Sequence, residues 1–217
     1  MKQQIFPICG MMSPIIFIVM IILGGALRSD YSHISDTMSE LFSPGSPNQL
    51  LLMSMHNISA ILTILFGVGV LKFIKKYSKI EIVGIGAAWM IILMGVINIS
   101  TASFFPQDAW GSPATLSGEI HKVLVGILVL LSILSTLLIG VFLKKVNILP
   151  SFMWYTFMTV GLILITGVFA ATKLGTPIMG LTERITAFIC LLWTFLFAFN
   201  IFLTQRHTII RNEVPGR

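Results

Sequence analysis

The chain has 217 residues, of which 56% are hydrophobic and only 10% are charged. A soluble domain carries about 25% charged residues, so this composition argues against an ordinary soluble class and indicates a membrane protein. The formal net charge of +6 suggests a nucleic-acid partner only at first sight, because the basic residues are grouped beside apolar stretches, as in a membrane topology signal.

The chain contains six apolar stretches of about 20 residues, and a helix of that length can cross the hydrocarbon core of a bilayer. In chain order they are about Ile5–Leu27, Leu50–Phe73, Ile82–Phe104, Ile120–Leu143, Ser151–Ala170 and Ile185–Leu203. The connectors between them are short. The sequence therefore predicts an all-α fold, a polytopic bundle of six transmembrane helices that forms a single domain over residues 1–217.

Basic residues are distributed unevenly over the two ends of this bundle. Ten precede the first stretch or follow the second, fourth and sixth, whereas the other connectors hold only Arg28, Lys122, Lys173 and Arg184. The positive-inside rule then predicts that both termini are cytoplasmic and that the three other connectors face outward.

The three outer connectors, Arg28–Gln49, Pro106–Glu119 and Ala171–Arg184, share the pattern Gly-Ser/Thr-Pro. Glycine can end a turn, the hydroxyl residue can cap the next helix, and proline suits its first turn. An internal repeat and ordinary helix-start chemistry both explain the pattern. His56, His121 and Arg184 lie nine, eight and seven residues after these prolines. At a rise of about 1.5 Å per residue, they should lie at similar depths in three helices.

The first outer connector has a helical pattern of its own. Its apolar residues Ile34, Met38, Leu41 and Phe42 would share one face, and its polar residues His33, Asp36, Thr37 and Glu40 the other. This predicts a short helix lying on the outer surface between the first two spans. Alternatively, Thr37 and Glu40 form a capping box, which would start a helix later.

Ionisable groups in or beside membrane spans are costly and point to a functional site. The predicted ligand-binding residues, all assigned to the outer end, are His33, Asp36, Glu40, His56, Asp108, His121 and Arg184. Such a mixture suits a lipid headgroup, since Arg184 can bind a phosphate and the acids can receive an amine. The same charges could instead pair with one another and close the bundle.

Asp36, His56 and His121 are also the candidate catalytic residues, and imidazole with carboxylate suits zinc. However, the sequence has no His-Glu-x-x-His motif or other local ligand spacing. Nearby bases would disfavour a cation. We therefore expect no cofactor, with zinc on Asp36, His56 and His121 as the alternative.

Several motifs carry a resemblance to a known family. Tyr31-Ser32-x-Ile34-Ser35-Asp36-Thr37, Pro44-Gly45-x-Pro47-Asn48, Phe105-Pro106-x-Asp108 and the later His121 resemble the bacterial membrane family called domain of unknown function 998. The Ile-Ser-Asp-Thr segment is more distantly similar to the damage-regulated autophagy modulators and their relatives in glycolipid remodelling. The resemblance implies a six-helix layout and a link to membrane lipid, but no reaction.

The expected function is to bind, sense or redistribute membrane lipid at the outer face of a bacterial cytoplasmic membrane. The alternative is a lipid hydrolase or acyl-transfer enzyme, which would need zinc or a histidine positioned against Ser32, Ser35 or Ser39. A small transporter is a third alternative. Whether the protein is an enzyme therefore stays open, as does its association into homo-oligomers; membrane lipid is the expected partner and nucleic acid is not.

Overall fold

The structure is a computed structural model that describes residues 4–77, 81–109 and 111–213, the last seven of them by their backbone only. The described residues form six α-helices and one short 3₁₀ helix. The α-helices are α1 (Ile5–Ala26), α2 (Gln49–Tyr77), α3 (Ile82–Ser103), α4 (Leu116–Val146), α5 (Pro150–Thr172) and α6 (Met179–Glu213). Each contains a stretch that is long and apolar enough to cross a membrane. The predicted all-α, six-span fold is confirmed.

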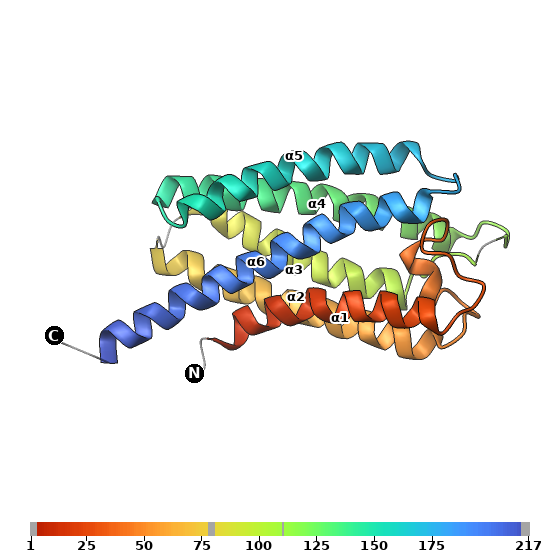
Figure 1. Cartoon of the computed structure of the whole chain (residues 1–217), viewed down its shortest axis with the longest axis horizontal. Helices are drawn as coiled ribbons and strands as arrows, with labels where there is room; N and C mark the ends of the chain where they lie inside the picture. Colours follow the sequence, from red (N-terminus) through yellow and green to blue (C-terminus); the bar gives the residue numbers. More distant parts are fainter. Residues whose placement is uncertain (1–3, 78–80, 110, 214–217) are drawn as a thin grey trace.

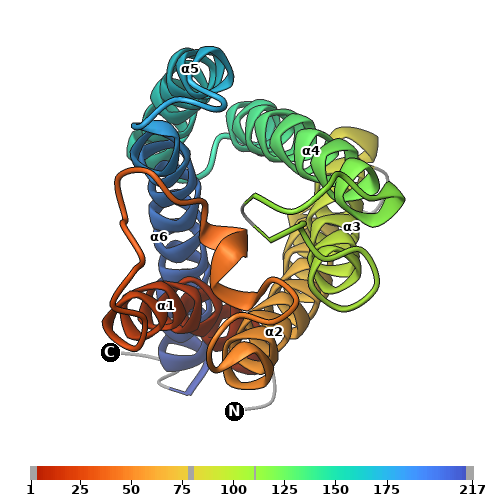
Figure 2. The same cartoon turned by 90° about the vertical axis from the view of Figure 1, so that its right-hand side faces the viewer.

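The helices follow one another around a ring, which closes where α6 packs against α1. Figure 1 shows both chain ends on the same side of the bundle. We call this side the terminal end, and we call the opposite side, where connectors join α1 to α2, α3 to α4 and α5 to α6, the loop end. The 3₁₀ helix η1 (Met38–Phe42) contacts α1, α2 and α6 and lies inside the mouth of the ring at the loop end (Figure 2).

Two clusters of buried side chains form the core. The larger lies toward the terminal end, where Phe152 and Phe197 stack with ring centroids 5.7 Å apart. The smaller lies at the loop end and includes Leu41 and Phe42 of η1 together with Leu52 of α2. The 3₁₀ helix is thus part of the hydrophobic core, and burial of its apolar side chains holds it in the mouth.

The short helix predicted in the first connector is present, but it is shorter than the pattern suggested and lies deeper. It begins at Met38, whereas Ile34 is outside it and 54% exposed. The Asp36 carboxylate accepts hydrogen bonds from the Ser32 N–H and the Ser35 hydroxyl, so this segment forms a turn. Thr37 occupies the N-cap position of η1, but its hydroxyl donates to Gln107 of the next connector.

The glycines of the three repeated tripeptides adopt one backbone conformation. Gly45, Gly111 and Gly175 have φ angles of 83°, 76° and 73°, in the left-handed region that glycine enters without strain. The pattern therefore marks the same turn in each connector, with the glycine four or five residues before α2, α4 and α6 begin.

At the terminal end, Glu81 precedes α3 and joins it to α4. Its carboxylate accepts hydrogen bonds from the Gly84 N–H (2.8 Å) and the Lys145 ammonium (2.6 Å), and Glu81 is only 3% exposed. The Lys145 bond and then the Gly84 bond lower the Glu81 pKa below its usual 4.5. A carboxylate whose pKa is lowered by folding stabilises the fold at any pH above its pKa in the unfolded chain. This stabilisation is lost as the pH falls through the lower pKa of the folded state.

We therefore expect Glu81→Gln to lower the free energy of unfolding by about 1 kcal/mol near neutral pH, and by less when the pH falls below the usual Glu81 pKa of 4.5. Thermal unfolding in detergent, at neutral pH and at a pH below 4.5, measures the difference in stability between wild type and Glu81→Gln. Glu119→Gln is the control, because the Glu119–Lys122 pair is more than half exposed on both sides and should contribute little. Equal effects of both variants would contradict the prediction.

Candidate functional site

Arg184, in the second turn of α6, fastens the first connector to the bundle. Its Nη1 donates to the carbonyl oxygens of His33 (2.8 Å), Asp36 (2.7 Å) and Gly180 (2.8 Å), and its Nη2 donates to the Tyr31 hydroxyl. Arg184 is only 5% exposed. We call Arg184 and these four acceptors the Arg184 latch. Both terminal nitrogens of the guanidinium are therefore already bonded to the protein.

Further hydrogen bonds hold the same two segments together. The Leu181 N–H donates to the Ile34 carbonyl (2.9 Å), and the Met38 N–H donates to the Glu183 carboxylate (3.1 Å). The first turns of α6 thus set the path of the connector into η1.

His121, in the second turn of α4, is 3% exposed and bonded through both ring nitrogens. Nδ1 lies 2.8 Å from the Phe105 carbonyl oxygen and 3.3 Å from that of Thr101. A carbonyl oxygen only accepts, so Nδ1 must carry a proton. Nε2 lies 3.2 Å from the Ser39 hydroxyl in η1. In the neutral ring, Nε2 is therefore the acceptor of the Ser39 hydroxyl proton.

His56 lies in the interior of the bundle beside α3. Its Nε2 donates to the Asn98 carbonyl (3.1 Å), and its ring packs between Phe17 and Phe42 at centroid distances of 5.6 and 4.9 Å. Among the described residues, its Nδ1 has no hydrogen-bond partner. His121 of α4 bonds to Thr101, which lies three residues beyond Asn98 in α3. The two histidines therefore contact α3 at adjacent turns.

The predicted carboxylates Asp36 and Asp108 shape their own loops. Asp36 accepts the Ser32 and Ser35 bonds described above. Asp108 accepts the Thr115 N–H (3.0 Å) and hydroxyl (2.6 Å) just before α4, and these bonds lower its pKa. His33 is exposed, and its ring packs edge-on against Tyr31 at 5.2 Å. Within the described parts of the chain, no three His, Cys, Asp or Glu side chains come together as metal ligands.

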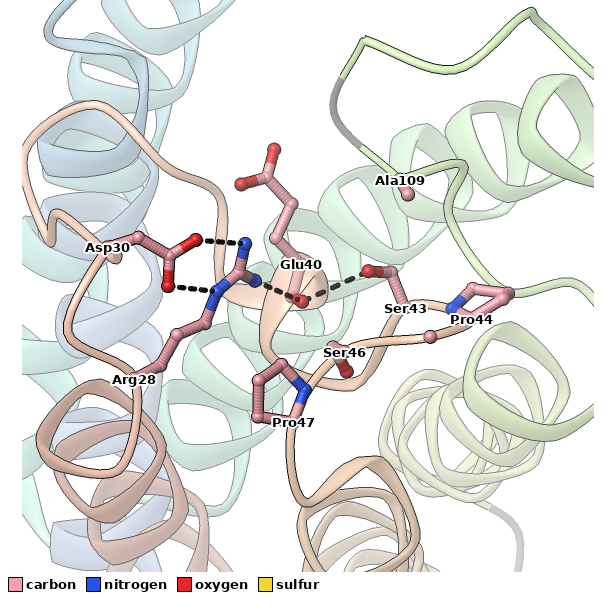
Figure 3. Close-up of a pocket in the computed structure, with 9 residues that line it drawn as sticks. Arg28, Asp30, Glu40, Ser43, Pro44, Ser46, Pro47 and Ala109 are labelled. Atoms are coloured by element: carbon pink, nitrogen blue, oxygen red, sulfur yellow. Dashed lines mark hydrogen bonds and ion pairs between the residues drawn. The ribbon is translucent and has the colours of Figure 1, made fainter.

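A cavity of about 390 Å³ lies at the loop end between the ends of α1 and α2. Figure 3 shows Arg28, Asp30 and Glu40 around it, with residues 43–47 and Ala109. Arg28 donates to the Asp30 carboxylate at 3.1 and 3.2 Å and to the Glu40 carbonyl at 3.2 Å. Of the predicted ligand-binding residues, all of which the structure describes, Glu40 is the one that lines this cavity.

The Glu40 side chain is the unusual charge of the cavity, because the residue is only 2% exposed. Burial, followed by the nearby Asp36 and Glu183, raises the Glu40 pKa to about 7, while Arg28 and Arg184 act in the opposite direction. Glu40 therefore gains its charge near neutral pH, unlike an exposed glutamate.

The structure separates the predicted residues into different environments. Arg184 and Asp36 belong to the latch, His121 meets Ser39, and Glu40 reaches the cavity. Arg28 and Asp30 were not among the predicted site residues, although they are the first charges after the first apolar stretch. Three serines were predicted as possible partners of a histidine, and Ser39 is the one that contacts His121.

Six membrane-length helices with a polar, connector-covered end define a polytopic α-helical membrane protein. The sequence profile of the family described as "Protein of unknown function (DUF998)" matches residues 11–200, and the chain belongs to this family. No curated protein and no solved structure matches the chain. The more distant resemblance to the damage-regulated autophagy modulators remains an expectation from the sequence.

Proposed function

We propose that the protein binds the zwitterionic headgroup of a membrane lipid in the loop-end cavity, on the outer side of a bacterial cytoplasmic membrane. The observation that carries this proposal is the cavity itself, at the ends of two membrane-length helices, where a guanidinium is bonded to the Asp30 carboxylate and the Glu40 carbonyl oxygen and Glu40 is a lining residue. The excess of basic residues at the terminal end supports the orientation, because such residues mark the cytoplasmic side.

The charges of the cavity match a phosphate and an amine. Arg28 can bind a phosphate through two parallel hydrogen bonds, and Asp30 and Glu40 can receive an ammonium group. The existing Arg28–Asp30 pair does not prevent this, since the two side chains are 20% and 69% exposed. Because the Asp30 side chain is mostly exposed to solvent, the pair contributes little to stability and a ligand can replace it.

Exposed leucines flank the cavity and provide a place for acyl chains. Leu27 immediately precedes Arg28 and is 45% exposed, while Leu50 and Leu51 follow Pro47 and are 73% and 48% exposed. An amphipathic ligand placed with its headgroup in the cavity would lay its chains along α1 and α2. This arrangement favours a lipid over a soluble zwitterion.

The proposal is tested by measuring the binding of a fluorescent phosphatidylethanolamine to the purified protein in detergent. We expect Arg28→Gln combined with Glu40→Gln to weaken binding about tenfold or more, the loss of roughly 1.4 kcal/mol. Lys122→Gln is the matched control, because it removes an exposed charge at the same end. Unchanged binding by the double variant would exclude this cavity as the lipid site.

The titration of Glu40 gives a second expected result. Binding of an amine-bearing lipid should strengthen as the pH rises through about 7, the pKa of Glu40, because the ionised carboxylate attracts the ammonium group. Glu40→Gln should remove this dependence. In the ligand-free protein, the raised Glu40 pKa affects folding stability in the opposite direction. Its contribution is fully present below pH 4.5, the ordinary glutamate pKa, and is lost as the pH rises to about 7, the pKa of Glu40 in the folded protein. The pH dependence of binding is checked by repeating the fluorescent-lipid assay over a series of pH values with wild type and Glu40→Gln. A pH series that is identical for wild type and variant would contradict the assignment.

A further inference from the structure

We propose that Ser39 and His121 form a nucleophile and general-base pair that cleaves an acyl ester of the bound lipid. The proposal rests on the proposed function for the supply of its substrate, and it adds a chemical step. Its basis is the contact of 3.2 Å between the Ser39 hydroxyl and His121 Nε2, which come from η1 and α4. This distance is at the upper limit of the range expected for a serine and its base.

The surroundings of His121 give the ring the tautomer that a base requires. Nδ1 carries the proton toward the Phe105 and Thr101 carbonyls, so Nε2 presents its lone pair to Ser39. When Nε2 takes up a proton, the ring becomes positively charged, and these two carbonyl oxygens stabilise that charge. They take the orienting role that a carboxylate has in a serine-histidine-aspartate triad.

The other serines of the first connector have different partners. The Ser35 hydroxyl donates to the Asp36 carboxylate at 2.8 Å, and the Ser32 hydroxyl accepts the N–H groups of Ile34 and Ser35. In the described part of the connector, Ser39 is thus the serine whose hydroxyl meets a histidine. The geometry therefore names one nucleophile.

Ser39 and His121 do not line the proposed lipid cavity, but the connector segments on its two sides, η1 and the segment between α3 and α4, bring Ser39 close to it. Ser39 is partly exposed, and the next residue, Glu40, lines the cavity together with Ala109. Gln107 joins these two segments, because it accepts from Thr37 at 3.1 Å and donates to Glu40 at 3.5 Å. An ester bond just below a headgroup held in the cavity would lie near Ser39.

The reaction balances with water as its co-reactant. The Ser39 oxygen bonds to the ester carbonyl carbon while its proton moves to His121 Nε2. The carbon–oxygen bond to the lipid alcohol then breaks, and the alcohol takes that proton. His121 next removes a proton from water, the hydroxide adds to the acyl-enzyme, and Ser39 leaves with the proton. The net products are a fatty acid and a lysolipid.

A small fluorophosphonate tests the pair without any lipid substrate. We expect one phosphonyl group per chain, attached to Ser39 as shown by mass spectrometry of the intact protein and its peptides. Ser39→Ala should abolish the modification, and His121→Gln, which keeps a hydrogen-bonding group but has no base, should slow it about 100-fold or more. Ser35→Ala is the matched control and should react like wild type. No modification of wild type between about pH 6 and pH 9 would overturn the proposal.

Ser39→Cys provides a readout that a purely structural hydrogen bond would not produce. A thiol next to a histidine ionises more easily, so its alkylation by iodoacetamide should reach half-maximal rate at a lower pH than in the Ser39→Cys/His121→Gln protein. The unmodified chain supplies the background from Cys9 and Cys190. Identical pH profiles in the two proteins would overturn the role of His121. Thermal unfolding verifies that each variant is folded.

Fatty-acid release from phosphatidylethanolamine vesicles distinguishes this proposal from lipid binding alone. Ser39→Ala should bind the fluorescent lipid like wild type but release no fatty acid. Arg28→Gln with Glu40→Gln should lose lipid binding and release, yet still react with the fluorophosphonate. If Ser39 reacts while the double variant still binds lipid, the cavity assignment fails and the catalytic pair stands. If wild type binds lipid but releases no fatty acid, the pair is not an esterase.

Discussion

Replacement of Arg184 by glutamine is expected to lower the free energy of unfolding by about 3 kcal/mol or more, the largest effect of any substitution at the loop end. The physical reason is that three carbonyl oxygens and the Tyr31 hydroxyl lose a donor inside the bundle. Glutamine is too short to restore these bonds together. Thermal unfolding in detergent measures the effect, and proteolysis within residues 28–48 reports whether the connector is released.

Two further variants define the latch. Tyr31→Phe removes one acceptor of Arg184 and should cost about 1 kcal/mol. Combined with Arg184→Gln the total loss should be smaller than the sum of the two single losses, because both changes break the Arg184–Tyr31 bond; the bond from the Tyr31 hydroxyl to the Thr37 carbonyl (2.8 Å) is lost only in Tyr31→Phe. Arg206→Gln is the control, since Arg206 is exposed at the opposite end of α6. An Arg184→Gln protein that unfolds at the wild-type temperature, with a protected connector, would contradict the latch.

Gly180→Ala is expected to separate α6 from the first connector. A Cβ atom at Gly180 would lie 2.2 Å from the Asp36 carbonyl oxygen and 2.9 Å from its carbon. These are backbone atoms that also belong to the latch, so they cannot move without moving Arg184. We expect a loss of about 1–3 kcal/mol in the free energy of unfolding, measured by thermal unfolding. Because Asp36 is three residues from Ser39, the reaction of Ser39 with the fluorophosphonate should also slow.

Gly161→Ala is the matched control for this substitution. It lies within α5, and among the described residues no atom outside its own helix lies within 4 Å of the added Cβ. Alanine is favoured over glycine in a helix interior by about 1 kcal/mol, so this variant should be as stable as wild type or more stable. Effects of the same sign and size at both positions would show that the close approach at Gly180 is unimportant.

The predicted spans agree with the helices in number, and they differ where polar residues begin a helix. The apolar stretch predicted from Ile185 is preceded in the structure by an additional turn and a half that starts at Met179. This start contains Thr182, Glu183 and Arg184, which hydropathy assigns to a connector. They are helical because Glu183 and Arg184 bond to the first connector instead of water, and the Thr182 hydroxyl donates to the Met179 carbonyl in the same helix.

The candidate site was predicted in part for a similar reason. The cost of burying charge singled out Arg184, His121 and Glu40 as residues that need partners at the loop end. It did not reveal that most of those partners are backbone carbonyls, which any residue provides and no residue pattern shows. The cavity was not predicted because Arg28 and Asp30 are ten or more residues from Glu40 in the sequence. Only the fold of the connector brings them together.

The sequence by itself determined the six helices, the uneven distribution of basic residues and the three glycine turns. These properties depend on local composition: twenty apolar residues favour a helix in a membrane, and a Gly-Ser/Thr-Pro tripeptide favours one turn. The tertiary structure alone decided that Arg184 binds the connector, that η1 lies in the mouth of the ring and that Ser39 meets His121. These contacts depend on how each helix is rotated and how far the connector is drawn inward. Packing among all six helices sets both quantities, and no single stretch of sequence contains them.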